Sequence, residues 1–168
     1  LSNGTYDDYD GTLTNMTGNE WALSSAFGAD ITAPTVSSFT STTADGSYKA
    51  GDSINITANT SESIASGNTL TVTLDTGDTV LLTSAADGST LVGSYTVGAG
   101  DNSNDLTVSS FSIGSVADLA GNAMTSTTVP SGSNNLAGSS NLVIDTTEPI
   151  VSSVTVGWGN SLNTLEDN

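Results

Sequence analysis

The apolar residues of this chain recur at every second position in a series of short runs separated by turn-forming residues. This alternation is typical of β-strands that turn one face to a core and the other to water. Clusters rich in Gly, Asp, Asn and Ser, such as "ADGSYKAGD" and "GAGDNSND", lie between the runs and predict tight turns. The sequence therefore predicts seven strands, at residues 35–41, 53–59, 69–75, 79–84, 90–97, 106–113 and 141–145.

Seven short strands with a turn every 8–12 residues are the pattern of an immunoglobulin-like β-sandwich. We therefore expect an all-β fold, with residues 115–122 ("SVADLAGN") as the only stretch that could hold a helical turn. The alternation also predicts which side chains face the core. These are Ile54, Ile56, Val72, Leu74, Tyr95, Val97, Val108 and Phe111.

One nine-residue phrase occurs twice. "DITAPTVSS" spans residues 30–38, and "DTTEPIVSS" spans residues 145–153. A second pair, "MTGNEW" at 16–21 and "LAGNAM" at 119–124, lies upstream of each copy. Self-similarity at about 100 residues predicts tandem domains. We interpret the chain as the C-terminal part of a preceding module (1–28), one complete module (29–146) and the first strand of a following module (147–168).

The charge of the chain restricts its partners. Eighteen acidic residues stand against one basic residue, Lys49, which gives a formal net charge of −17. Nucleic acid and anionic membrane surfaces both require a basic face, and this chain cannot form one. The sequence has no run of about 18 apolar residues, so we expect no direct membrane insertion. Cations are the partners that this charge favours.

Metal chemistry in this chain must use oxygen ligands, because the sequence has no Cys and no His. In the expected sandwich, two loops return to the end at which the chain enters the module. One loop, "TSESI", carries Glu62, and the other, "ADLAGN", carries Asp118 and Asn122, while Asp30 lies in the linker before the first strand. We expect these four residues to converge on calcium, with Asn122 contributing a carbonyl oxygen.

The repeated phrase predicts an equivalent site at the next junction. There, Asp145 is expected to bind calcium together with Asp101 or Asp105, which lie in the turn "GDNSNDL". The alternative for all of these residues is that Asp and Asn close turns through their side chains without a metal.

The residues described above also carry a resemblance. The stretches "DITAPTVSSFTSTTADGSYKAGDSINITANTSESI", "LVGSYTVGAGDNSNDL", "VADLAGNAM" and "VIDTTEPIVSSV" resemble the tandem bacterial immunoglobulin-like repeats of giant surface adhesins and related S-layer or sheath proteins. The resemblance covers residues 30–154. It implies an extracellular, cell-surface location and a role as a rigid, calcium-stiffened spacer. It further implies that the partners are neighbouring modules of the same chain, or copies of the chain in a lattice or filament.

Two other classes of function compete with the spacer. An enzyme without His or Cys would need a pair of carboxylates with one buried acid, and the glutamates lie in Ser/Thr/Gly-rich contexts without an apolar pocket signal. We therefore expect no enzymatic activity. A carbohydrate- or protein-binding sandwich module is the stronger alternative, although such a module would be expected to cluster aromatic residues, and those of this chain are scattered.

Overall fold

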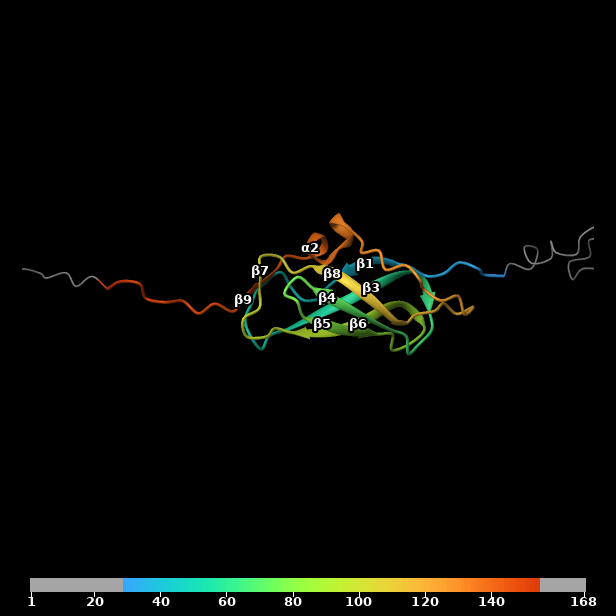
Figure 1. Ribbon diagram of the computed structural model, residues 1–168, viewed down its shortest axis with the longest axis horizontal. Coiled ribbons are helices and arrows are strands. Elements are labelled where there is room, and N and C mark those ends of the chain that lie inside the picture. Colours follow the sequence, from blue (N-terminus) through green and yellow to red (C-terminus); the bar gives the residue numbers. More distant parts are fainter. Residues whose placement is uncertain (1–28, 155–168) are drawn as a thin grey trace, which may run out of the picture.

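The computed structural model describes residues 29–154, which form one mostly-β domain (Figure 1). Its nine strands include all seven that the alternation predicts, and the all-β class is confirmed. The two additional strands, β2 and β7, are two or three residues long. The strands are β1 (Val36–Thr40), β2 (Gly46–Tyr48), β3 (Ser53–Ile64), β4 (Thr69–Leu74), β5 (Thr79–Thr83), β6 (Gly88–Thr96), β7 (Asn102–Ser103), β8 (Val108–Ser115) and β9 (Leu142–Asp145).

The strands form two sheets of unequal size. Six strands form one antiparallel sheet in the order β1-β3-β6-β5-β4-β8, and this sheet curls into a half-barrel. The short strands form a second sheet in the order β2-β9-β7. The expected immunoglobulin-like sandwich, in which two sheets of similar size pack face to face, is therefore not confirmed by the strand pairing.

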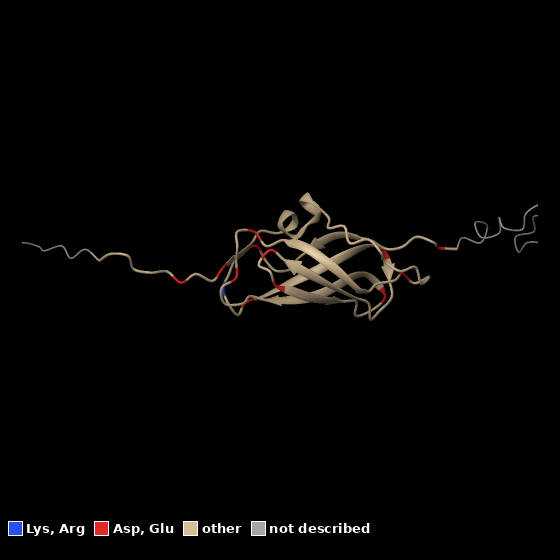
Figure 2. Ribbon diagram, in the orientation of Figure 1, with Lys and Arg blue, Asp and Glu red and all other residues tan. Residues whose placement is uncertain are grey.

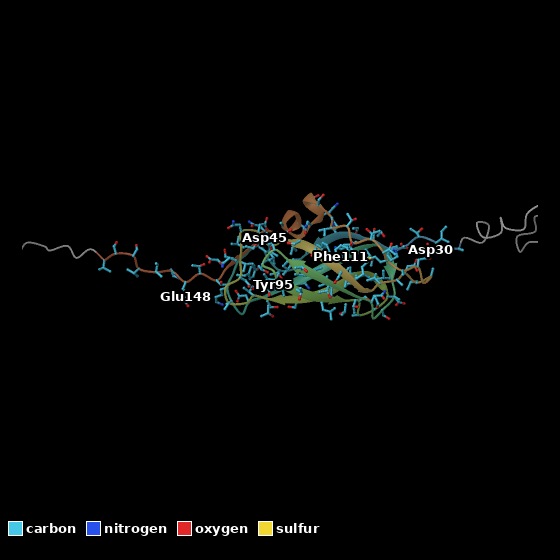
Figure 3. All side chains as sticks on the ribbon, viewed as in Figure 1. Asp30, Asp45, Tyr95, Phe111 and Glu148 are labelled. Carbon is cyan, nitrogen blue, oxygen red and sulfur yellow. The ribbon has the colours of Figure 1, made fainter. Side chains whose placement is uncertain are left out.

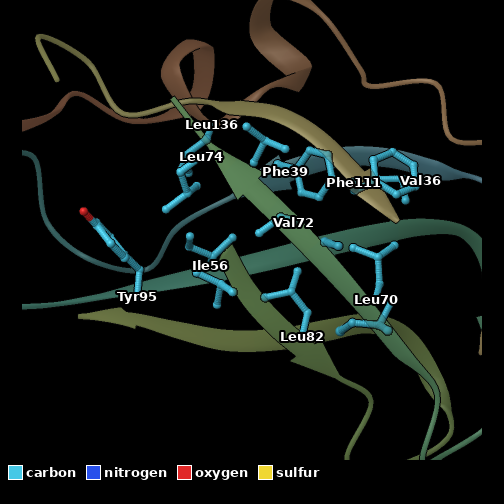
Figure 4. Packing of buried hydrophobic residues seen from close by; sticks show 14 of the residues in the cluster. Val36, Phe39, Ile56, Leu70, Val72, Leu74, Leu82, Tyr95, Phe111 and Leu136 are labelled. Atoms are coloured by element: carbon cyan, nitrogen blue, oxygen red, sulfur yellow. The ribbon is translucent and has the colours of Figure 1, made fainter. Parts of the chain in front are cut away.

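The core fills the concave side of the curled sheet. Strands β3, β4 and β5 bury every second residue there, as β4 does with Leu70, Val72 and Leu74, whereas β1 and β8 bury residues three apart. All eight side chains predicted to be buried are at most 7% exposed, and they belong to a single hydrophobic cluster (Figure 4). Because its members run from Val36 to Ile144, the module contains a complete core of its own.

The open side of the half-barrel lies between its two edge strands, β1 and β8. Phe39 of β1 and Phe111 of β8 meet across this opening, with ring centroids 5.8 Å apart at an interplanar angle of 67°. A short 3-10 helix, η2 (Gly132–Asn134), and one turn of α-helix, α2 (Leu136–Ser139), cover the opening. Leu136 is fully buried against the same cluster, so α2 acts as a lid on the core.

One side chain ties this lid to the sheet. The amide of Asn135 donates from Nδ2 to the carbonyl of Val108 (3.0 Å) and accepts from the Val108 N–H (3.2 Å). It therefore satisfies both backbone groups of Val108, the first residue of the free edge of β8. The same Oδ1 accepts from the N–H of Leu136 at 2.7 Å, so Asn135 also caps α2.

Three local expectations differ from the structure. β3 continues through "TSESI", so Glu62 lies near the end of a strand and not in a loop. Residues 115–122 hold no helix; they form part of a small hairpin whose ends meet at the Ala117–Ala123 bridge. The helical turns lie instead within residues 132–139, outside the stretch expected to hold one, and Leu136 is buried there.

The two chain ends leave the module at opposite ends of its long axis (Figures 1 and 3). We call them the N-terminal pole, where Asp30 lies, and the C-terminal pole, where β9 ends. The proposed preceding module (1–28) and the proposed next strand beyond residue 154 lie outside the described residues. Residues 147–154 belong to no strand, and Ile150, Val151 and Val154 are exposed. Within the described residues, no helix is long and apolar enough to cross a membrane.

We expect Asn135→Ala to destabilise the module by about 1–3 kcal/mol, because it removes a helix cap and leaves the edge of β8 without its partner. Urea denaturation, followed by far-UV circular dichroism, measures the change in the free energy of unfolding. Asn134→Ala is the matched control, since Asn134 is exposed and bonds through its backbone N–H to Ser131. Equal unfolding midpoints for the two variants would contradict the edge-closing role of Asn135.

Candidate metal site

The acidic residues of the module gather at its two poles (Figure 2). Among the described residues, the only charged side chains within strands are Glu62 and Asp145, and each is at or near a strand end. At the N-terminal pole, Asp30, Glu62 and Asp118 each offer a carboxylate oxygen, and these oxygens lie within 4.8 Å of one another. This acidic cluster could hold a metal ion.

β3 brings Glu62 into the cluster. Burial along β3 alternates, with Ile54, Ile56 and Ala58 fully buried, and Glu62 continues this core-facing row to the end of the strand. A carboxylate thus occupies a position that the alternation reserves for core side chains. It is half-buried, and its Oε1 is a buried atom without a hydrogen-bond partner in the described part of the chain.

The hairpin at residues 117–123 brings in Asp118. An isolated bridge pairs Asp118 with Ile64, two residues beyond Glu62 on the same row. The Asp118 N–H donates to the carbonyl of Asn122 (3.1 Å), and Gly121 turns the chain with a φ of +97°, a conformation that side chains other than glycine rarely adopt. Asp118 is buried, at 4% exposure, which makes it the most enclosed of the three carboxylates.

Asn122 joins the hairpin to the chain that enters the module. Its Nδ2 donates to Oδ2 of Asp118 (2.7 Å) and to the backbone carbonyl of Asp30 (3.0 Å). The Asp30 carboxylate accepts from the N–H of Thr32 at 3.0 Å, which is an Asx-turn. Sequence reasoning gave Asn122 a metal-ligand role; the structure shows its side-chain amide holding Asp30 and Asp118 in place.

A second contact fixes the same segment to β3. The N–H of Thr35 donates to Oγ of Ser61 (3.0 Å), and the Ser61 N–H donates to the carbonyl of Thr35 (2.9 Å). Sequence reasoning missed Ser61, because one serine in a chain this rich in Ser and Thr carries no distinguishing signal. Its position beside Glu62 is the only clue that the sequence holds.

The electrostatics of Glu62 and Asp118 differ. Burial raises the pKa of Glu62, and the negative charges of Asp30 and Asp118 raise it further. Burial alone would also raise the pKa of Asp118, but hydrogen bonds from Asn122 and from the backbone of the hairpin outweigh it and hold that pKa below its usual range. Asp118 is therefore a stable anion, whereas Glu62 is the member whose charge is costly without a cation.

The geometry fits an oxygen-liganded divalent cation. Calcium binds oxygens at 2.3–2.6 Å, so two ligands of one ion can be up to about 5 Å apart, and the 4.8 Å limit of the cluster falls within that span. A cation would give the orphaned Oε1 of Glu62 a partner and would remove the repulsion among three carboxylates. Waters or backbone carbonyls would have to complete the six to eight ligands of calcium.

The predicted residues at the C-terminal pole are not brought together in the same way. Asp101 accepts from the hydroxyl of Tyr95 (2.5 Å) and the N–H of Gly98 (2.6 Å), and these bonds lower its pKa and close its own loop. Asp105 accepts from the N–H of Leu142 at 3.4 Å. Asp145 accepts from the N–H of Thr147 at 2.9 Å, an Asx-turn that matches that of Asp30. In the part of the chain that the structure describes, these three residues form no cluster like that of the N-terminal pole.

Comparison of the chain with models of protein families, with curated proteins and with solved structures finds no match. The assignment of this site therefore rests on its own chemistry.

We expect Glu62→Gln to stabilise the metal-free module at pH 7. A folded-state pKa above the usual value of about 4.3 means that the folded protein binds the Glu62 proton more tightly than the unfolded chain. That contribution is fully present below about pH 4 and is lost as the pH rises through the raised pKa, and glutamine mimics the protonated form. Urea midpoints in EDTA should thus be higher for the variant at pH 7 and should converge with those of the wild type near pH 4.

Glu148→Gln is the control for this comparison. Glu148 is exposed on the segment beyond β9, so its variant should follow the wild type at every pH. A wild-type module as stable as Glu62→Gln at pH 7 in EDTA would contradict the electrostatic description of the cluster.

Proposed function

We propose that this chain is a non-catalytic extender module of a large extracellular surface protein, repeated in tandem and stiffened by calcium at the junctions between modules. The immunoglobulin-like assignment belongs to this proposal. The observation that carries it is that residues 145–147 are bound at the C-terminal pole, while Asp30, which the repeated phrase makes the counterpart of Asp145, is bound at the N-terminal pole. A junction in which every linker residue is bound to a module resists bending.

The preceding module holds the linker through the residues after β9. The Thr146 hydroxyl donates to the carbonyl of Asp101 (2.9 Å) and accepts from the N–H of Gly100 (3.1 Å). The N–H of Thr146 donates to Oδ1 of Asn102 at 3.3 Å, and the Thr147 hydroxyl donates to the same oxygen at 3.4 Å. The chain is thus attached to the C-terminal pole as far as Thr147.

If the repeated phrase marks equivalent positions, a following module would hold residues 145–147 in the way that this module holds residues 30–32. Residues 30–32 correspond to residues 145–147 in sequence. At the N-terminal pole, the Asp30 carbonyl is held by Asn122 and its carboxylate lies in the acidic cluster. Asp145 is therefore both the last residue of β9 and the counterpart of Asp30, so the two attachments overlap.

Calcium would reinforce this joint. Extracellular sites of this type bind at about 10⁻⁴–10⁻³ M, so about 10 mM calcium would stabilise each site by roughly 1.4–2.7 kcal/mol. This is too little to create the fold but comparable to one or two net hydrogen bonds, which is enough to strengthen a linker that depends on a few of them. Magnesium should bind less well, because it gives up its waters reluctantly.

Calcium should raise the melting temperature of the chain by roughly 4–10 °C, and EDTA should reverse this. Asp30→Asn should abolish most of the increase, because it removes a carboxylate from the cluster but retains the Asx-turn. Asp145→Asn is the matched control: it has the same turn, and the counterparts of Glu62 and Asp118 for it would lie beyond residue 168. Equal calcium responses of the two variants in differential scanning calorimetry would refute the assignment of the site.

The spacer role itself is tested on a chain whose module is duplicated in register, with residues 1–148 followed directly by residues 34–168. This junction retains the native sequence from β9 through Pro34. Small-angle X-ray scattering should give a longer maximum dimension, with less bending between the modules, in calcium than in EDTA. The same dimension in both conditions would remove calcium stiffening from the proposal.

A further inference from the structure

We propose that consecutive modules also contact each other directly: Leu119 of one module inserts into a groove at the C-terminal pole of the module before it. This inference rests on the proposed tandem arrangement but does not depend on calcium. Its partner is a second copy of the module, positioned head to tail.

The groove lies beside the end of β9. It has a volume of about 510 Å³ and is lined by Asp75, residues 102–104 and residues 143–145. Val143, which is partly exposed, provides an apolar part, whereas Ile144 is only 2% exposed and belongs to the core. The Asp75 carboxylate is already satisfied by the hydroxyl of Ser103 (2.6 Å) and the N–H of Thr107 (3.0 Å). Both carboxylate oxygens of Asp75 therefore already have hydrogen-bond partners within the module.

Leu119 is the side chain at the opposite pole that suits such a groove. It follows Asp118 in the hairpin of the acidic cluster and is 62% exposed, although most large apolar residues of the module are buried. The upstream copy of this loop has Met16 at the same position, three residues before its own Asn. A large apolar residue thus stands at this point in both copies.

In the proposed tandem chain, Asp145 would bring the groove of one module next to Leu119 of the following module. Asp145 lines the groove, and its counterpart Asp30 is held by Asn122 in the hairpin that carries Leu119. The sequence before Asp30 supports this register, because "SSAFGAD" at residues 24–30 matches "SSNLVID" at residues 139–145, where β9 lies. In a tandem chain, the hairpin of the following module would contact Asp145 and so lie next to the groove.

The length of the linker leaves little freedom to avoid this contact. Asp145 belongs to β9 of the first module, and by equivalence its carbonyl is bound by the hairpin of the second. No residue separates the two attachments, so the two poles must face each other at side-chain distance. The apolar part of the groove and Leu119 are the surfaces that gain from being removed from water there.

The absence of cysteine makes disulfide trapping a clean test. In the duplicated chain, residues 1–148 followed by residues 34–168, Asn104→Cys in the first copy places a thiol in the groove and Leu119→Cys in the second copy places one on the hairpin. Both positions are exposed, so the fold tolerates the substitutions. We expect this pair to form a disulfide at least ten times faster than a control pair, in mild oxidant, in calcium or in EDTA.

The control pair combines the same Leu119→Cys with Leu81→Cys in the first copy. Leu81 is 58% exposed on β5, on the wall of the half-barrel away from the poles. A groove pair that forms no faster than this control in either condition would overturn the inference. Scattering on the unsubstituted duplicate separates this result from the spacer proposal: calcium stiffening without selective trapping rejects the Leu119 contact alone, and selective trapping without stiffening rejects the calcium role alone.

Discussion

The whole module depends on closing a curled sheet that has two free edges. A sheet of six strands buries its concave face only if something covers the gap between the first strand and the last, here β1 and β8. Phe39 and Phe111 fill that gap from inside, and α2 covers it from outside with Leu136. Asn135 ties the cover to the sheet, because its amide satisfies both backbone groups of Val108 at the start of the free edge of β8.

The strands of the half-barrel carry almost no charged residues, so the charge of the module lies at its two poles. The strands that form the wall carry mainly Ser, Thr and Asn on their outer faces, together with the exposed Leu81 and Val92, and the carboxylates are confined to loops and strand ends. The separation concentrates negative charge where the chain enters and leaves the module (Figure 2). In the proposed tandem arrangement, like charges so placed would hold the modules apart unless a cation lay between them.

The sequence was sufficient to predict the features of the fold that depend on local periodicity. Strand positions and the eight core residues follow from alternation, and the convergence of Asp30, Glu62 and Asp118 follows from strand order and the return of loops to one pole. It was insufficient for the division into sheets, because alternation does not say which strands pair. It also missed the role of Asn135, since one asparagine in a Gly/Ser/Asn-rich stretch looks like any other until its partner at Val108 is known.

In the proposed tandem arrangement, Asp145 is the residue through which local hydrogen bonds would determine the shape of a longer chain. In a chain of separate domains, bending takes place in the residues between them, and its cost depends on how many contacts must break. Here the Thr146 and Thr147 contacts fix the linker to one module, and the contacts seen at Asp30 would fix the same residues to the next. Any bend must break one of the two sets, at about 1 kcal/mol for each net hydrogen bond. Stiffness over many modules would then come from the overlap of two weak attachments on three residues, with a cation adding to one of them.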